Sequence, residues 1–139
     1  MPDRAVTLEE LEAEAADAWR TVPRHGVVWL SGELGTGKTT FVRALTRAAH
    51  AQSARSPTYA LVHEYASPDG PIVHVDCYRL RTPGDAILLD MAALRRTARL
   101  LVIEWPERAG AHAPPPDLHL RLAHVPDPER RSLERIACP

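Results

Sequence analysis

The 139-residue sequence contains only two cysteines, and no apolar run in it approaches the length of a membrane span. Cys77 and Cys138 lie far apart and outside any metal-binding spacing, which favours free thiols in a reducing compartment over a disulfide framework. The seven histidines are scattered without the spacing of metal ligands, so a zinc site is not expected. The N-terminal stretch is acidic and polar, unlike a signal peptide. We therefore expect a cytoplasmic protein with no membrane partner.

The sequence also has little net charge, because seventeen basic and eighteen acidic side chains leave a balance of −1. This balance argues against a protein whose main task is to hold nucleic acid, since such proteins usually carry a basic excess. The length suffices for one buried core, but not for a nucleotide-binding domain together with a separate substrate domain. We expect a single domain over residues 1–139.

Lysine is nearly absent, because sixteen of the seventeen basic residues are arginine and the one lysine is Lys38. Lys38 lies in the spacing G-x-x-x-x-G-K-[ST] after the apolar run 27–30, which predicts a phosphate-binding loop between a strand and a helix. Glycines let the backbone curl around phosphate oxygens, and a compact ammonium fits such a loop better than a planar guanidinium. The predicted nucleotide-contacting residues of the loop are Gly32, Glu33, Leu34, Gly35, Thr36, Gly37, Lys38, Thr39 and Thr40.

Two carboxylates, Asp76 and Glu104, each end a short apolar run that reads as a buried strand. In an open α/β sheet the ligand binds at the carboxyl ends of the strands. Either carboxylate is therefore a candidate to hold a metal ion while the other orients an attacking water, although each would also fit a turn cap. We predict Thr39, Asp76 and Glu104 as metal-holding residues, and Lys38, Asp76 and Glu104 as catalytic residues.

Three further features are weaker candidates. The turn Ser56-Pro57-Thr58 lies where nucleotide switches sense a phosphate through a hydroxyl, so Thr58 is predicted to contact nucleotide, although a plain turn fits equally. Trp105 is a candidate to stack on the nucleotide, but a tryptophan at a strand end more often packs in a core or rim. The pairs Arg95–Arg96 and Arg130–Arg131 fit solvated surfaces, and either is also a candidate contact for RNA or nucleotide.

Hydrophobic periodicity predicts a helix over residues 8–20, with a capping box of Thr7 and Glu10 at its start and Pro23 after its end. A second helix follows the phosphate loop. A third is predicted over residues 86–96, with Ile87 and Leu88 among its buried positions.

Residues 53–58 are predicted as a loop. Short apolar or alternating runs predict strands over residues 27–30, 59–65, 71–76, 100–104, 118–122 and 132–136. A turn at residues 67–70 joins two of these as a hairpin, and the last two are expected to form an antiparallel pair.

Four stretches together resemble the bacterial TsaE (formerly YjeE) family, the ATPases of tRNA threonylcarbamoyladenosine biosynthesis. They are residues 32–40, 56–59, 74–80 and 103–108, in the order and approximate spacing of the family. The predicted elements and this resemblance imply an α/β fold of the P-loop NTPase type, with three layers, a mixed and mainly parallel central sheet and a C-terminal antiparallel strand pair.

The resemblance also implies roles for single residues. Lys38 and Thr39 match the phosphate and magnesium positions of the family, and Asp76 matches the acid of its Asp-x-Tyr-Arg motif. Glu104 and Trp105 match its Glu-Trp pair beside the metal and the nucleotide, and residues 56–58 match its first switch. The chain departs from the family at Thr36, where Ala or Ser is more usual and where we expect the side chain to point outward, and residues 82–90 keep the family pattern only loosely.

ATP and Mg²⁺ are the cofactors that the resemblance implies, with weak hydrolysis by the chain alone. The implied partners are the TsaD and TsaB proteins, which transfer a threonylcarbamoyl group to tRNA, so that tRNA would be reached through the complex. Two other hypotheses remain open. One is a small-molecule kinase with a lid of Arg95, Arg96 and Arg99, and the other is a nucleotide switch that does not hydrolyse.

Overall fold

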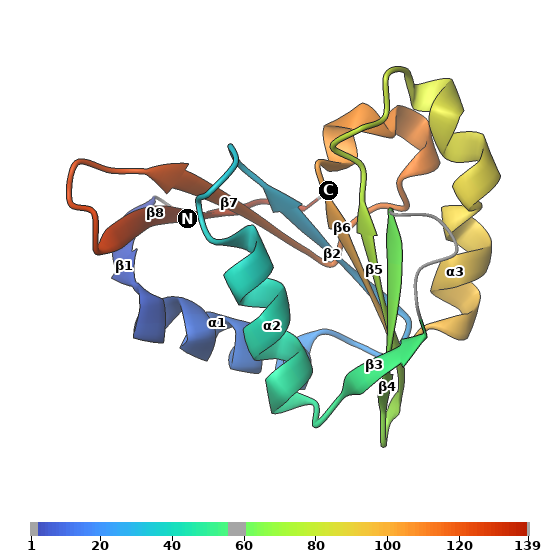
Figure 1. Cartoon of the computed structure of the whole chain (residues 1–139), viewed down its shortest axis with the longest axis horizontal. Coiled ribbons are helices and arrows are strands. Elements are labelled where there is room, and N and C mark those ends of the chain that lie inside the picture. The colour runs from blue at the N-terminus through green and yellow to red at the C-terminus, as the bar shows by residue number, and fades with distance from the viewer. Residues whose placement is uncertain (1–2, 56–60, 139) are drawn as a thin grey trace.

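The computed structural model describes residues 3–55 and 61–138, and the strands of this part of the chain form one eight-stranded sheet (Figure 1). The order across the sheet is β1-β8-β7-β2-β6-β5-β4-β3. The strands are β1 Arg4–Thr7, β2 Gly26–Ser31, β3 Gln52–Arg55, β4 Val62–Ser67, β5 Gly70–Asp76, β6 Leu100–Glu104, β7 Leu118–His124 and β8 Arg130–Ile136. The helices are α1 Leu8–Thr21, α2 Lys38–Ala48 and α3 Met91–Thr97, with 3₁₀ segments η1 Pro83–Leu89, η2 Pro106–Arg108 and η3 Gly110–His112.

The central strands run parallel and the flanking strands do not. β2 pairs in parallel with both β6 and β7, and β5 pairs in parallel with β6. The flanking pairs β1–β8, β7–β8, β3–β4 and β4–β5 are antiparallel. Every residue of β6 is buried, as expected for a strand covered on both faces. The predicted mixed sheet, the hairpin before β6 and the C-terminal antiparallel pair are therefore confirmed.

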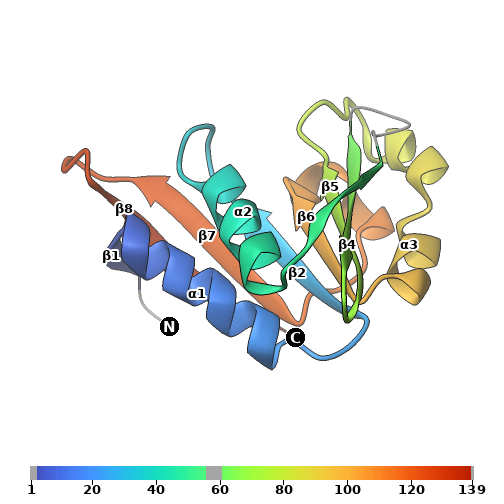
Figure 2. The ribbon, with the colours of Figure 1, turned by 60° about the horizontal axis from the view of Figure 1, so that its bottom comes forward.

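Helices cover both faces of the sheet and make three layers. α1 and α2 lie on one face and α3 lies on the other (Figures 1 and 2). α1 begins at the predicted capping box, in which the backbone N–H of Glu10 donates to the Thr7 hydroxyl and the N–H of Thr7 donates to the Glu10 carboxylate. The helix ends before Pro23, also as predicted.

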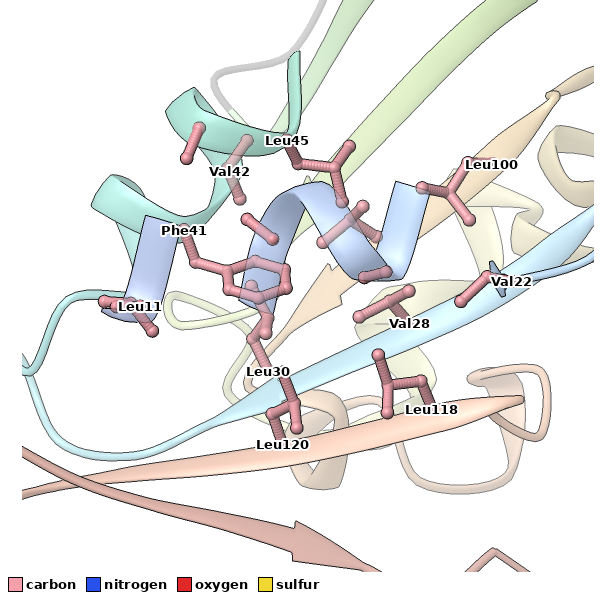
Figure 3. Close-up of a cluster of buried hydrophobic side chains, with 14 of the residues drawn as sticks. Leu11, Val22, Val28, Leu30, Phe41, Val42, Leu45, Leu100, Leu118 and Leu120 are labelled. Carbon is pink, nitrogen blue, oxygen red and sulfur yellow. The ribbon is translucent and has the colours of Figure 1, made fainter. Parts of the chain in front are cut away.

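The larger apolar cluster joins the sheet to α1 and α2 (Figure 3). Leu11 of α1, Phe41 of α2 and Leu30 of β2 are all fully buried in it. A second cluster on the other face contains Met91 of α3 and Ile103 of β6. Burial of each large apolar side chain contributes roughly 1.5–3 kcal/mol to stability, so the two clusters fix the positions of the central strands and of the residues at their ends.

The outermost strands of the sheet, β1 and β3, are not predicted by the sequence pattern. β1 pairs with β8, and β3 pairs with β4. The expectation of a loop over residues 53–58 is therefore wrong for 53–55, while 56–58 lie outside the described residues. Strands of four residues at an edge are held mainly by backbone hydrogen bonds to a neighbour, and such pairing leaves little periodicity in the sequence.

The predicted helix over residues 86–96 is also wrong, because η1 and α3 replace it. Asp90 lies between them in the left-handed region with a φ of 44°, and its side chain accepts from the N–H of Ala93 to cap α3. Ile87 and Leu88, predicted as buried, are 62% and 85% exposed. A 3₁₀ turn repeats every three residues, so the faces expected from a continuous α-helix do not apply.

Both cysteines are free, as predicted, with Cys77 buried and Cys138 exposed. Burial raises the pKa of the Cys77 thiol to about 12, so this group is neutral at physiological pH and is not a nucleophile. None of the helices in residues 3–55 and 61–138 has both the length and the apolar character that crossing a bilayer requires.

Candidate functional site

The phosphate loop runs from the end of β2 to the start of α2, and its path depends on glycine. Gly32 has a φ of 136° and Gly37 a φ of 113°, which side-chain-bearing residues rarely adopt. A Cβ on Gly32 would lie 2.1 Å from the carbonyl oxygen of Leu122 on β7. The β2–β7 pairing thus brings the neighbouring strand so close to the loop that only glycine fits there.

The loop ends at the first turn of α2, whose N-cap is Gly37. No side chain of the described residues caps this helix, so the N–H groups of its first turn point toward the loop without a capping acceptor. The positive end of the helix dipole adds to their attraction for an anion. Thr39 in this turn is exposed, with its hydroxyl available to a ligand.

Lys38 is 5% exposed, and its ammonium group lies inside the curl of the loop. Its Nζ donates to the carbonyl oxygens of Gly32 and Glu33, the latter at 3.0 Å. Burial lowers the pKa of Lys38, and the negative charges of Glu104 and Asp76 oppose this shift. A phosphate at the loop would add negative charge beside this cation.

Asp76 and Glu104 end two adjacent parallel strands, and their Cα positions are paired in the register of β5 and β6. Glu104 is also paired with Leu30 of β2, two residues before the loop begins. Asp76 accepts a hydrogen bond from the backbone N–H of Tyr78 at 3.0 Å. The structure thus brings both carboxylates to the edge of the sheet where the phosphate loop lies.

Glu104 is 5% exposed, and a residue that the sequence argument did not single out holds its carboxylate. The Nε2–H of His74 on β5 donates to Oε2 of Glu104 over 2.5 Å, and His74 is itself buried. The ring of His63 on β4 stacks on His74, with centroids 5.9 Å apart. The available sequence signal was spacing, since His74 lies two residues before Asp76 and therefore on the same face of the strand.

Lys38, Asp76 and Glu104 line one cavity of about 360 Å³ at the carboxyl ends of the parallel strands. Its lining residues are Leu8, Leu34, Gly35, Gly37, Lys38, Thr39, Thr40, Asp76, Glu104 and Arg131. Residues 3–55 and 61–138 contain no group of three or more His, Cys, Asp or Glu side chains placed to hold a metal. Mg²⁺ does not need such a group, because one or two carboxylates and the phosphates of a substrate usually hold it.

Trp105 lies beside this cavity and packs against the phosphate-loop lysine. Lys38 Nζ lies 4.5 Å from the centroid of the Trp105 ring, and the centroids of the Tyr78 and Trp105 rings are 5.1 Å apart. The guanidinium of Arg108 lies 5.1 Å from the same ring. Trp105 has a φ of 55°, a strained value for a bulky residue that is typical of functional sites. Stacking of Trp105 on a nucleotide stays a prediction.

Some predicted positions differ from what the structure shows. Thr36 is 2% exposed and donates to the carbonyl oxygen of Glu33 at 2.8 Å, so the expectation of an outward side chain is wrong. Its hydroxyl instead braces the loop. Arg95 and Arg96 lie in the last turn of α3 and Arg99 lies between α3 and β6, at the ends of the parallel strands opposite the phosphate loop, which removes them as a lid over it. Thr58 lies outside the described residues.

Comparison with known proteins agrees with these features. The sequence profile of the family described as "Threonylcarbamoyl adenosine biosynthesis protein TsaE" matches residues 5–133. A protein of Haemophilus influenzae named tRNA threonylcarbamoyladenosine biosynthesis protein TsaE is 34% identical over 112 residues, which cover 80% of this chain and 70% of that protein. A protein of the same name from Aquifex aeolicus is 38% identical over 85 residues, covering 59% of each.

A solved structure extends the likeness to the fold. The crystal structure of YdiB from Bacillus subtilis superposes with a TM-score of 0.78, covering 99% of this chain and 86% of that one at 22% identity. The family profile spans nearly all of the described chain, including the phosphate loop and the two strand-end carboxylates. The chain therefore belongs to the TsaE family.

Proposed function

We propose that this chain binds Mg²⁺-ATP at the phosphate loop and hydrolyses it in support of tRNA threonylcarbamoyladenosine synthesis. One observation carries the proposal: Lys38, Thr39, Asp76 and Glu104 line a single cavity beside a glycine loop that admits no Cβ at Gly32. A buried ammonium, a free helix N-terminus and two carboxylates at one sheet edge are the parts that phosphoryl transfer from a nucleotide requires.

The residues divide the work by their chemistry. Lys38 binds phosphate oxygens, because its ammonium group already lies inside the loop. Within the described chain it donates hydrogen bonds only to the carbonyl oxygens of Gly32 and Glu33. The Thr39 hydroxyl and one of the two carboxylates hold the metal, which when bound neutralises phosphate charge. The other carboxylate orients the attacking water and accepts its proton. His74 keeps the Glu104 carboxylate in one orientation.

The partners of the proposed function are the TsaD and TsaB proteins, and tRNA is reached through them. The names of the relatives from Haemophilus influenzae and Aquifex aeolicus support a place in threonylcarbamoyladenosine synthesis. A small-molecule kinase is not favoured, because its candidate lid residues Arg95, Arg96 and Arg99 lie at the opposite ends of the parallel strands. A switch that binds nucleotide without hydrolysis is the remaining alternative, and turnover distinguishes it.

The test is the steady-state ATPase rate of the chain, alone and with the TsaD and TsaB proteins of the same organism, with Lys38→Ala as the blank. We expect weak turnover that the partners stimulate, and none in the blank. Glu104→Gln and Asp76→Asn separate the two carboxylate roles. The variant that binds ATP but needs more Mg²⁺ identifies the metal holder, and the variant with normal Mg²⁺ dependence of binding but no turnover identifies the water-orienting group. Turnover equal to wild type in both variants would contradict the catalytic assignment.

A further inference from the structure

Arg131, for which the sequence left open a solvated surface or a contact with RNA or nucleotide, lines the phosphate-loop cavity. It lies on β8, where its Cα is paired with Val6 of β1 and with His124 of β7. Nη1 of its guanidinium would lie 3.4 Å from a Cβ on Gly37, the last glycine of the loop. The β7–β8 hairpin thus delivers a second cation to the cavity that holds Lys38.

The charge of Arg131 is unpaired within the described chain. No hydrogen bond or ion pair joins its guanidinium to another described residue, and the residue is only half-exposed. The neighbouring Arg130 differs from Arg131 in both exposure and ion pairing. Arg130 is exposed and lies 3.7 Å from carboxylate oxygens of both Glu10 and Asp127. Adjacent strand residues point to opposite faces, so one arginine is neutralised by the surface and the other is directed at the loop.

The strand order gives Arg131 a distinct side of the cavity. β8 and β7 lie on one side of β2, whereas β6 and β5, which end in Glu104 and Asp76, lie on the other. Arg131 therefore flanks the phosphate loop from the side away from the two carboxylates. A metal held by the carboxylates would supply positive charge from their side, so phosphate oxygens that face β8 would need a cation of their own. A guanidinium suits them, because it donates several hydrogen bonds in a fixed plane.

We propose that Arg131 is a nucleotide-contacting residue whose guanidinium pairs with a phosphate group of the bound nucleotide. This rests on the proposed function, since it places Arg131 in the same nucleotide site. The partner of this half-buried cation is then the ligand itself, and the hairpin of β7 and β8 forms one wall of the nucleotide site.

The test is calorimetric titration of ADP and ATP with Mg²⁺ into the wild type, Arg131→Ala and Arg130→Ala. Loss of a charged hydrogen bond to phosphate predicts a dissociation constant that rises about tenfold to a hundredfold in Arg131→Ala. Arg130→Ala should stay within about twofold of the wild type, because its charge is screened at the surface. Arg131→Lys keeps the charge without the planar fork, so we expect it to recover part of the loss.

Pyrophosphate as a competitor distinguishes a phosphate contact from stacking on the base. We expect Arg131→Ala to weaken pyrophosphate binding as it weakens ATP binding, while its thermal unfolding midpoint stays close to that of Arg130→Ala. Unchanged nucleotide and pyrophosphate affinities in Arg131→Ala, with a wild type that binds both, would overturn this inference alone. A wild type that binds no nucleotide would overturn the proposed function and this inference with it.

Discussion

The parallel strands begin at one side of the sheet, here called the amino edge, and end at the other, the carboxyl edge. These two edges use their charged residues in opposite ways. At the amino edge, Arg24 and Arg99 both pair with Asp69, at 2.9 and 2.7 Å. The Arg99 guanidinium also stacks on Trp19 of α1, 4.6 Å from its ring centroid. These contacts tie a hairpin turn, a helix and the start of β6 together. The charges of this edge therefore hold the fold.

At the carboxyl edge, His74 pairs with Glu104, but the two cations of the cavity have no carboxylate partner within the described chain. Lys38 is bonded to loop carbonyls rather than to a carboxylate, and the described chain offers no ion-pair partner to Arg131. Trp105 at the same edge has a φ of 55°, a strained value for a bulky side chain. Cations that lack a carboxylate partner lower stability unless a ligand offsets their charge, so their position at one cavity indicates binding.

Among the substitutions that test this contrast between the two edges, Gly32→Ala is expected to have the largest effect on stability and on nucleotide binding. The new Cβ would lie 2.1 Å from the Leu122 carbonyl oxygen at a φ of 136°. Strain and overpacking together should lower the free energy of unfolding by about 3 kcal/mol or more and abolish nucleotide binding. Urea denaturation measures the first effect and calorimetry the second.

The matched control is Gly84→Ala on η1, where a Cβ meets only the Thr82 hydroxyl at 3.7 Å and φ is not positive. We expect a change within about 0.5 kcal/mol there. Equal losses in the two variants would mean that the phosphate loop has no special need for glycine.

A smaller effect is expected from His74→Ala, which removes the donor to Glu104. By analogy with residues that orient metal-bound carboxylates, we expect turnover to fall about tenfold to a hundredfold with nucleotide still bound. His74→Gln places an amide donor near the position of Nε2 and should recover most of the rate. His63→Ala removes the stacked ring but not the hydrogen bond, and should cost much less. Equal rates in the alanine and glutamine variants would show that the hydrogen bond does not matter.

The smallest effect is expected at the amino edge, from Asp69→Asn. The hydrogen bond from Arg99 chiefly, together with the charge of Arg24, holds the pKa of Asp69 below its usual value of 3.8. A depressed carboxyl pKa stabilises the folded state at pH values above the unfolded pKa and loses this contribution as the pH falls through the folded pKa. Asp69→Asn should therefore flatten the loss of stability below about pH 4, in thermal unfolding across pH, and leave nucleotide affinity unchanged.

The sequence predicts the phosphate loop well because its chemistry is local. Gly32, Gly37 and Lys38 lie within one short stretch, and their spacing alone specifies a curled backbone with one ammonium. Asp76 and Glu104 are also accessible to sequence reasoning, because each ends a buried strand and parallel strands end at a common edge. The same apolar runs predict the central strands of the sheet.

Other features depend on register and on backbone breaks that periodicity does not reveal. His74 meets Glu104 because β5 and β6 are paired, and Arg131 meets Gly37 because β8 is joined to the sheet through β7. The left-handed Asp90 splits a helical pattern whose apolar spacing looked continuous. The first two depend on the register of strands that are distant in sequence, and the third depends on a local backbone conformation that apolar spacing does not encode.

The most direct test of the contrast between the two edges is calorimetric titration of Mg²⁺-ATP into the wild type, Lys38→Ala and Arg99→Ala. If the carboxyl edge binds nucleotide and the amino edge holds the fold, Lys38→Ala should weaken binding at least about a hundredfold, since a buried cation loses its contacts with phosphate. Arg99→Ala should bind like the wild type while unfolding at a lower temperature. Wild-type affinity in Lys38→Ala, or loss of binding in folded Arg99→Ala, would contradict the account.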